Sequence, residues 1–267
     1  MILPAAPYVE EKPIQKGKAY LSHSRVNKYE TCPEQYRLYY VENLRPRLAS
    51  ANLVFGSIIH QSLAVLFADQ KEPIEHFIDS WGWLKDIELG YSRTDTWEKL
   101  KTIGEKLLTS FLKTEAGKIS NIQGVEKPFE ISITGIDVPL VGVIDLVGDI
   151  QGVSTVVDFK TSSSSYGDYE VMLSDQLTAY QIAYPTAKQL AFCVLTKTKE
   201  PRIEWFVGTR TGGDMVGYLR KLQIVAKWIR YKVFHKRPGK HCAWCDFLPI
   251  CTGNTRKAKE TLVQVDV

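Results

Sequence analysis

The chain has 267 residues, of which 44% are hydrophobic and 24% are charged, and its formal net charge is +4. This composition is ordinary for a globular protein with a sizeable buried core, and it argues against a disordered or fibrous chain. No apolar run approaches the roughly 18 residues that span a bilayer, and the N-terminus lacks the charged and apolar regions of a secretory signal. We therefore expect a cytoplasmic protein, whose mild positive charge permits a nucleic-acid partner without requiring one.

The first half of the chain is predicted to be mainly helical. Residues 1–20 contain three prolines and no periodic pattern, which indicates an irregular arm. A helical region follows at 21–120, where Ser22 or Ser24 can cap the first helix and Pro33 divides it into two short helices. Apolar periodicity predicts further helices at Phe55–Phe67, Pro73–Leu89 and Thr94–Thr114.

The second half contains segments that are rich in Val and Ile and bounded by Gly, which indicates the strands of a β-sheet. In chain order we predict strands at Glu126–Thr134, Val138–Leu146 and Thr155–Lys160, a helix at Tyr169–Ala183, strands at Gln189–Lys197 and Arg202–Thr209, and a helix at Met215–Phe234. They form a core of residues 121–235, which precedes a short, irregular, cysteine-rich tail at 236–267. Helices around a central mixed sheet indicate an α/β or α+β core with a helical insertion before it, and we predict the α/β class.

Two carboxylates and a lysine lie on two of these strands, which a turn at Gly148–Gly152 is predicted to join. Aspartates in apolar strands are costly to bury unless they are paired or hold a metal. Asp158 and Lys160 point to the same face because strand side chains alternate with a period of two, and the hairpin partner can bring Asp145 beside them. We interpret this group as a divalent-metal hydrolytic site. The alternative is a structural ion pair of Asp158 with Lys160, with Asp145 capping a turn.

Two helical patterns accompany this group. His60 lies in an apolar helix, and Gln176 and Tyr180 are four residues apart, so they share one helix face. Taken singly, a histidine of this kind is more often an ordinary core or surface residue. Taken together, the chain carries four motifs in order, at Gly56–His60, Gly142–Asp145, Asp158–Lys160 and Gln176–Tyr180.

This ordered set resembles the RecB-like branch of the PD-(D/E)xK nuclease superfamily, which carries Gly-x-x-x-His, Gly-x-Ile-Asp, Asp/Glu-x-Lys and Gln-x-x-x-Tyr motifs on the corresponding elements. The resemblance implies a restriction-endonuclease-like core and a metal-dependent DNA nuclease. It implies that Asp145, Asp158 and the backbone carbonyl of Phe159 hold Mg²⁺ or Mn²⁺, with His60 adding a nitrogen ligand that favours Mn²⁺.

The resemblance also implies roles for the remaining motif residues. Lys160 would position the attacking water or stabilise charge on the scissile phosphate. Gln176 and Tyr180 would support the site and contact DNA. Glu126, on the preceding strand, is a weaker candidate for the same cleft, and a surface strand glutamate is the alternative interpretation.

The cysteines form a second pattern. Cys193 lies in an apolar strand and is interpreted as a small buried hydrophobe. Cys242, Cys245 and Cys251 form a Cys-x-x-Cys-x5-Cys cluster, for which Cys32 is the natural fourth ligand. Clusters of this kind in a cytosolic protein indicate a metal site rather than disulfides, and four thiolates alone fit either zinc or an iron–sulfur cluster.

The resemblance favours the iron–sulfur cluster over zinc. Iron–sulfur members of the RecB-like family have one cysteine before the nuclease core, in a Cys-Pro-x-x-Tyr context like Cys32–Tyr36, and three after it. In this respect the chain is similar to the nuclease of the AddAB recombination machinery and to the RecB-like nucleases of CRISPR adaptation. We predict a structural [4Fe–4S] cluster that ties the N-terminal helices to the C-terminal tail.

A basic segment follows the core. Lys227–Lys240 contains six Lys and Arg residues interleaved with aromatic residues. Basic groups can neutralise phosphates and aromatic faces can stack on bases, so the segment is either part of a nucleic-acid groove or the solvated face of a helix end.

The function implied by the resemblance is a single-stranded-DNA exonuclease acting in recombination, repair, phage DNA metabolism or CRISPR adaptation. The chain has no Gly-x-x-x-x-Gly-Lys-Ser/Thr motif, so unwinding would come from a helicase or from a recombination or integration protein. The alternative from another class is a catalytically silent DNA-binding or scaffolding module of a recombination complex. The intact His60, Asp145, Asp158 and Lys160 argue against that alternative.

Overall fold

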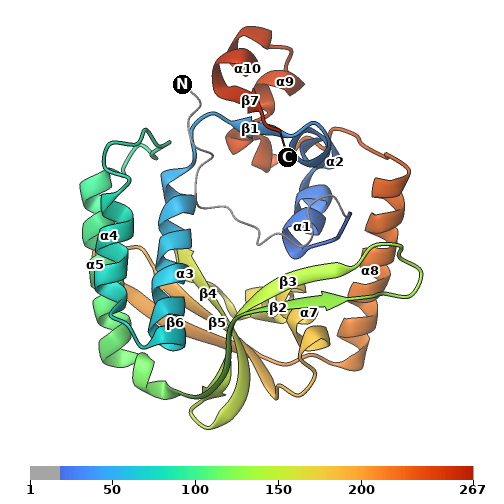
Figure 1. Ribbon diagram of the computed structural model, residues 1–267. Coiled ribbons are helices and arrows are strands. Elements are labelled where there is room, and N and C mark those ends of the chain that lie inside the picture. The colour runs from blue at the N-terminus through green and yellow to red at the C-terminus, as the bar shows by residue number, and fades with distance from the viewer. Residues whose placement is uncertain (1–18, 267) are drawn as a thin grey trace.

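A five-stranded mixed sheet forms the centre of the protein, which is described by a computed structural model at residues 19–266 (Figure 1). The predicted arm at 1–20 therefore lies almost wholly outside the described residues. The strand order is β2-β3-β4-β5-β6, and only β4 and β5 are parallel to each other. The bounds are β2 Ile119–Ile131, β3 Leu140–Ile150, β4 Val153–Ser162, β5 Gln189–Thr196 and β6 Arg202–Gly208.

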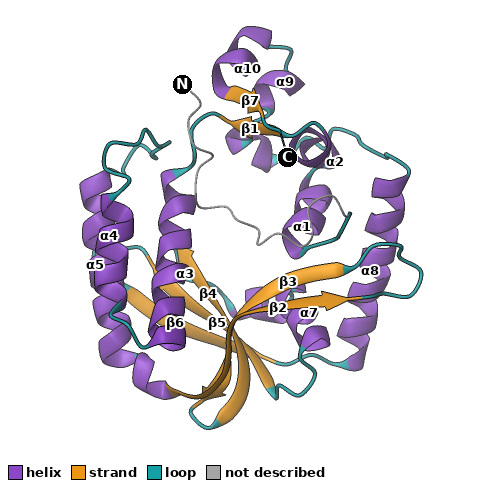
Figure 2. Ribbon diagram, viewed as in Figure 1, coloured by secondary structure: helices purple, strands orange, loops and turns teal. Residues whose placement is uncertain are grey.

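Helices cover both faces of this sheet, which confirms the predicted α/β class (Figure 2). On one side lie α3 Ala51–Asp69, α4 Pro73–Gly82 and α5 Trp97–Thr114, followed by the short η2 Ala116–Lys118. On the other side lie α1 His23–Thr31, α6 Asp168–Met172, α7 Asp175–Ala183 and α8 Gly212–Arg230. The remaining N-terminal elements are α2 Pro33–Tyr36, the π-helical turn η1 Arg37–Val41 and β1 Leu44–Pro46.

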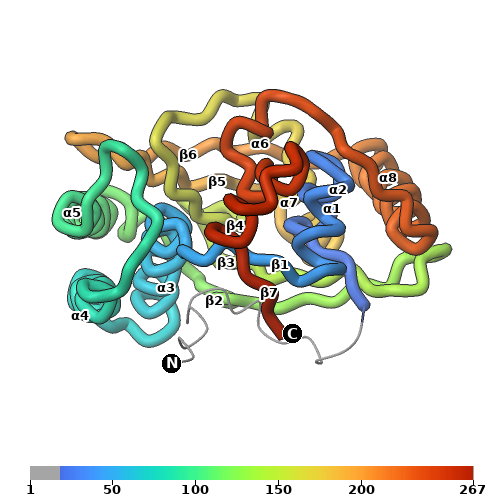
Figure 3. The backbone as a smooth tube through the Cα atoms, turned by 90° about the horizontal axis from the view of Figure 1, so that it is seen from above, coloured from blue at the N-terminus to red at the C-terminus, as the bar shows by residue number. Residues whose placement is uncertain are grey.

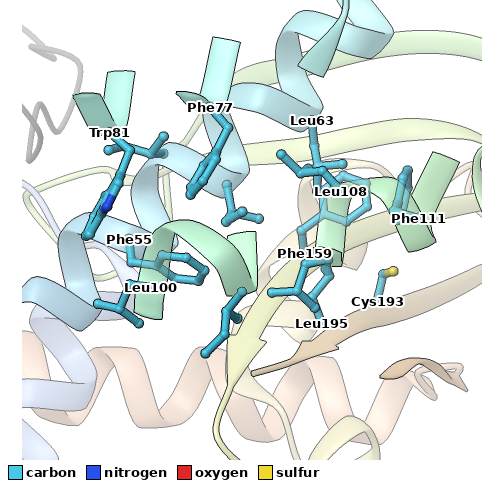
Figure 4. Close-up of a cluster of buried hydrophobic side chains, with 14 of the residues drawn as sticks. Phe55, Leu63, Phe77, Trp81, Leu100, Leu108, Phe111, Phe159, Cys193 and Leu195 are labelled. Atoms are coloured by element: carbon cyan, nitrogen blue, oxygen red, sulfur yellow. The ribbon is translucent and has the colours of Figure 1, made fainter. Parts of the chain in front are cut away.

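Two apolar cores hold β4 from opposite faces. Val157 and Phe159 pack with α3, α4 and α5, in a core that Figure 4 shows together with Phe55, Phe77 and Trp81. Val156 packs into a second core with Leu177 and other residues of α7. This alternation follows from the two-residue period of a strand, and it fixes β4 between the two layers of helices.

Several predicted elements are confirmed with changed ends. The oxygen of Ser22 accepts a hydrogen bond from the backbone N–H of Arg25 at 3.3 Å and caps α1, and Pro33 begins a separate helix as expected. The helix predicted from Pro73 ends at Gly82 rather than Leu89. The expected boundary between 120 and 121 falls inside β2. The hairpin turn is shorter than predicted, because Gly148 belongs to β3.

The turn itself consists of Gln151 and Gly152, whose φ angles are 52° and 82°. Positive φ at both positions is the signature of a two-residue hairpin turn whose twist matches that of the flanking strands.

Two predictions were wrong. The helix expected at Tyr169–Ala183 is divided into α6 and α7, because Ser174 caps α7 and Arg210 donates to the carbonyls of Val171 and Ser174 between them. The tail is not irregular: it contains η3 Lys240–Trp244, α9 Leu248–Cys251, α10 Thr255–Thr261 and β7 Leu262–Gln264.

The tail is attached to the N-terminal segment. β7 pairs antiparallel with β1, and Phe247 and Leu262 pack with Leu38 in a small core of their own. Seen from above, the tail lies across the middle of the molecule, between α4 and α5 at one end and α8 at the other (Figure 3). Two segments far apart in sequence therefore form one structural unit.

Helix α3 is long and apolar, although polar residues interrupt it. It is 19 residues long with a mean hydropathy of 1.5, so its length and composition would suffice to cross a membrane. In this fold 44% of that stretch is buried, and the helix packs against α4, β2 and β4. Its apolar character is accounted for by its place in the core.

Two helical glycines differ in the space that surrounds them. A Cβ at Gly104 of α5 would lie 2.0 Å from the ring of Phe77, which is fully buried, whereas a Cβ at Gly217 of α8 would meet nothing within 4 Å. We expect Gly104→Ala to lower the free energy of unfolding by about 1–3 kcal/mol through overpacking. Gly217→Ala should raise it by about 0.5–1 kcal/mol, because alanine is the better helix former. Urea denaturation measures both, and equal effects would contradict the described packing.

Candidate active site

Asp158 and Lys160 of β4 form the centre of the site. The side chain of Asp158 is 1% exposed, and its Oδ2 lies 2.7 Å from Nζ of Lys160. This buried oxygen is ion-paired with the lysine, and within residues 19–266 no other group bonds to it. Burial tends to lower the pKa of Lys160, but the Asp158 carboxylate outweighs it and the pKa is raised. The lysine is therefore charged at neutral pH.

Helix α7 supplies two side chains that complete a ring of contacts. Gln176 donates from Nε2 to Oδ1 of Asp158 at 2.6 Å and accepts from Lys160 Nζ at 2.8 Å. The hydroxyl of Tyr180 lies 3.1 Å from the same Oδ1 and 2.8 Å from the carbonyl oxygen of Val143, to which it can donate. Burial, followed by the charge of Asp158, raises the pKa of Tyr180 well above its ordinary value. The amide thus joins the carboxylate to the ammonium.

Asp145 lies on β3 where the hairpin opens. The pairing of β3 with β4 ends at Leu146 opposite Val157, so Asp145 and Asp158 stand just beyond the last pair. There the backbone N–H of Phe159 donates to Oδ2 of Asp145 at 2.8 Å. The Asp145 carboxylate thus takes the place of a backbone partner on the neighbouring strand. Burial, and then the negative charge of Asp158, raises the pKa of Asp145 well above its usual value.

His60 reaches the same carboxylate from α3. Its Nδ1 lies 3.3 Å from Oδ2 of Asp145, and burial lowers the pKa of the imidazole to about 4. A neutral imidazole can donate from one ring nitrogen and ligate with the other. The approach of α3 depends on Gly56, where a Cβ would lie 2.9 Å from Oγ1 of Thr161 at the end of β4.

The residues predicted from the sequence are thus gathered around one place, but not as a preformed cage. Within the described part of the chain, no three His, Cys, Asp or Glu side chains stand in a metal-holding arrangement. The donors nevertheless fit a hard divalent cation, since carboxylate and carbonyl oxygens are its preferred ligands. Oδ2 of Asp158 has the ammonium of Lys160 as its partner among the described residues, so it keeps a lone pair that such a cation could take. The charge of Glu126 contributes, after burial and Asp158, to raising the pKa of Asp145, and its place in the cleft stays a prediction.

Two contributors were missed in the sequence. His23, at the first position of α1, is electrostatically coupled to Lys160 and Asp158, and its pKa is lowered first by burial and then by the lysine. Arg210 fixes the α6–α7 corner beside Gln176. Neither belongs to a motif. Both act through contacts between segments far apart in the chain, for which a single sequence carries no signal.

The cysteines are distributed as follows. Cys32 is buried between α1 and α2, and Nε2 of the nearby Gln35 lies 3.7 Å from Sγ of Cys245. Burial raises the thiol pKa of Cys245 and of Cys251. The charge of Cys242 contributes to raising both pKa values. The charge of Cys251 contributes at Cys245, and that of Cys32 contributes at Cys251. Cys193, fully buried in β5, belongs to the α3–α5 core instead, as predicted.

The basic segment Lys227–Lys240 is largely exposed, and half of its Lys and Arg side chains have structural partners. Arg230 pairs with Asp137, Lys236 donates to the carbonyl of Cys251, and Arg237 donates to the carbonyl of Glu30. These contacts favour the solvated-face interpretation for this part of the surface.

Comparison with known proteins identifies the family. The sequence model of the PD-(D/E)XK nuclease superfamily matches residues 20–252. Among solved structures, the chain is similar to a "Putative exonuclease" from Eubacterium rectale, with a TM-score of 0.54, 14% identity and 87% of each chain covered. It also aligns with SSO0001 at a TM-score of 0.44 and 16% identity, covering 89% of this chain and 88% of that one. No curated protein matches it. At this low identity, the similarity to the first structure shows a shared fold and nothing more. The similarity to the second structure is too weak to support a conclusion.

The raised pKa of Asp145 predicts the effect of Asp145→Asn on stability. A carboxyl whose pKa is higher in the folded state stabilises the fold in acid, and that contribution is lost as the pH rises through the folded pKa. Asparagine does not ionise, so the metal-free variant should melt above wild type at neutral pH and show little difference in acid. A gain of about 1 kcal/mol would raise the melting temperature by about 2–4 °C.

Asp149→Asn is the matched control on the same strand, where the carboxylate accepts from Asn121 at 3.2 Å. It should show no such gain at neutral pH. Thermal melts of both variants between acid and neutral pH make the comparison. A loss of stability in Asp145→Asn at neutral pH would contradict the buried like-charge arrangement.

Proposed function

We propose that this chain, which belongs to the PD-(D/E)XK nuclease superfamily, is a metal-dependent deoxyribonuclease that digests single-stranded or frayed DNA ends. The observation that carries the proposal is the ring of contacts among Asp158, Lys160, Gln176 and Tyr180 beside Asp145. A ring of this kind holds an ammonium group beside a carboxylate, so that a phosphate could meet the lysine directly and the carboxylate through a bound cation. The preference for single strands and ends rests on the resemblance.

The cation would be Mn²⁺ or Mg²⁺. Asp145, Asp158 and the backbone carbonyl of Phe159 are the oxygen donors that would hold it, and the neutral His60 is the nitrogen donor. When bound, the cation supplies positive charge that activates the attacking water and neutralises the charge developing on the phosphate. It would also relieve the repulsion that raises the pKa of Asp145, because both carboxylates would then face a positive charge.

The protein side chains have separate tasks. Lys160 stays protonated next to Asp158, so its ammonium can orient water or stabilise the scissile phosphate in the transition state. Gln176 bonds to both partners, which limits the rotamers that either can adopt. Tyr180 ties this group to the β3 backbone at Val143. Preorganisation of this kind reduces the reorganisation needed during the reaction.

The rival interpretations account for less of this arrangement. A structural ion pair of Asp158 with Lys160 would not require a second buried carboxylate on β3, which is costly unless something positive compensates it. A catalytically silent DNA-binding module would not need a lysine, an amide and two carboxylates held in contact. The nuclease proposal accounts both for the second carboxylate on β3 and for the contacts that hold the lysine, the amide and the carboxylates together.

Digestion of end-labelled single-stranded DNA with Mn²⁺ tests the proposal. Asp158→Ala and Lys160→Ala should each lower the cleavage rate by at least about a hundredfold, since each removes a charged group that acts in the transition state. Asp149→Ala, on the strand that carries Asp145, should cleave like wild type. Absence of metal-dependent cleavage by wild type, or equal cleavage by all four proteins, would refute the nuclease proposal.

We also propose that Cys32, Cys242, Cys245 and Cys251 hold a structural [4Fe–4S] cluster. The electrostatic coupling of Cys251 to Cys32 and Cys242, and the contact of Gln35 with Cys245, support a common site. Its donor set of four cysteines fits such a cluster, and zinc is the alternative. The role would be to reinforce the attachment of the tail to α1 and α2.

Anaerobic purification followed by iron, sulfide and zinc analysis tests this site. Wild type should contain iron and sulfide and show the broad visible absorption of an iron–sulfur protein. Cys32→Ala and Cys245→Ala should lose the iron, whereas Cys193→Ala should keep it because that thiol belongs to the sheet core. Stoichiometric zinc without iron in wild type would overturn the iron–sulfur assignment.

A further inference from the structure

A cavity of about 210 Å³ opens between α1, the β2–β3 hairpin and α7, next to the catalytic group. Gln176 and Tyr180 form part of its wall, and both contact Oδ1 of Asp158. Any group that fills the cavity would therefore lie beside the scissile phosphate. Because pockets for drug-sized ligands measure about 300–1,000 Å³, this one suits a single unit of a polymer rather than a free cofactor.

The walls of the cavity are suited to a flat aromatic ring. Tyr20 and Phe129 contribute rings, and the floor is formed by β3 from Leu140 to Val143, a stretch without polar side chains. Phe129 can take its position because Gly142 has no side chain, since a Cβ there would lie 2.6 Å from the ring. Tyr20 is held by the guanidinium of Arg25, whose central carbon lies 4.1 Å from the ring centroid. Rings over an apolar floor are the usual surroundings of a stacked nucleobase.

His23 lies in the wall of the cavity and adds hydrogen-bonding capacity. Burial, and then the charge of Lys160, lowers the pKa of this imidazole, so it is neutral at pH 7. A neutral imidazole offers one donor and one acceptor, which suits the edge of a base better than it suits a phosphate. His23 is only partly buried, and it lines the cavity.

We propose that this cavity is a subsite for one unpaired nucleobase of the substrate strand, next to the scissile phosphate, with His23 as its hydrogen-bonding contact. The proposal rests on the nuclease function above and deepens it by naming what the site recognises. A base stacked and paired within a duplex would have to be extruded to enter, at the cost of its pairing and stacking. Single strands and frayed ends avoid that cost, so the subsite gives the proposed substrate preference a physical cause.

Oligonucleotides with one abasic nucleotide test the subsite. Single-stranded substrates carry the abasic position at the first, second, third or fourth nucleotide from the digested end, and cleavage with Mn²⁺ is timed. For wild type we expect a loss of about tenfold or more at one position, the size of losing one stacked base. His23→Ala should cleave the intact strand more slowly and lose less on the abasic strand than wild type does, because the rings of Tyr20 and Phe129 remain while the hydrogen bonds of His23 to the base are gone. His23→Gln, which keeps hydrogen bonds without the ring, should fall between them.

The control is His235→Ala, because His235 is exposed and lies outside the cavity and the catalytic group. It should keep both the rate and the discrimination of wild type. Substitution at His23 should not unfold the protein, since the residue is at the helix start and alanine is compatible with that position; thermal melts check this. Equal rates on intact and abasic strands in wild type would overturn the proposal, and so would unchanged discrimination in His23→Ala.

A binding measurement separates this proposal from the nuclease function. A single-stranded oligonucleotide with 2-aminopurine at the critical position is added in Ca²⁺, and its fluorescence reports entry of the base into stacked surroundings. A change that wild type shows and His23→Ala lacks would support the subsite even if wild type cleaved nothing, a result that refutes only the nuclease function. Identical fluorescence with both proteins would overturn the subsite even if cleavage were normal.

Discussion

The separation of β3 from β4 beyond Leu146 and Val157 is the constraint on which the site depends. Had the ladder continued, Asp145 and Asp158 would stand directly opposite on one face, where like charges destabilise a strand pair. The strands part instead. Asp145 turns to His60 on α3 and accepts from the N–H of Phe159, while Asp158 turns to the α7 side. Both carboxylates therefore border the opening.

The sequence predicted the local geometry of this site well, because that geometry depends on short-range periodicity. The two-residue period of a strand placed Lys160 with Asp158, and the helical period placed Gln176 with Tyr180; the contacts at 2.7 Å and 2.9 Å agree. Their functional roles remain predictions. The point at which the strands part was not predictable, because it depends on the packing of α3 and α7 on opposite faces of the sheet.

The errors share that cause. The periodicity through Tyr169–Ala183 favours one helix, yet Ser174 can serve as a cap, and Arg210 on a distant segment stabilises the break. The tail was predicted as irregular because its helices are too short to show a period. They are stabilised by burial of Phe247 and Leu262 on Leu38 and by pairing with β1. In both cases a tertiary contact decides between local alternatives.

The packing of β4 in two apolar cores explains how an unfavourable site can persist. The burial of the Asp145 carboxylate and its repulsion by Asp158 oppose folding in the metal-free protein, as the raised pKa of Asp145 indicates. Yet β4 cannot move to relieve them, since Val157 and Phe159 are anchored in one apolar core and Val156 in the other. The alternation that fixes the strand thus also fixes Asp158 and Lys160. The two cores therefore keep in place a site that is unfavourable for the metal-free fold. Functional sites are where a sequence is expected to depart from the rules that favour stability, and this site would be ready for a cation and a phosphate.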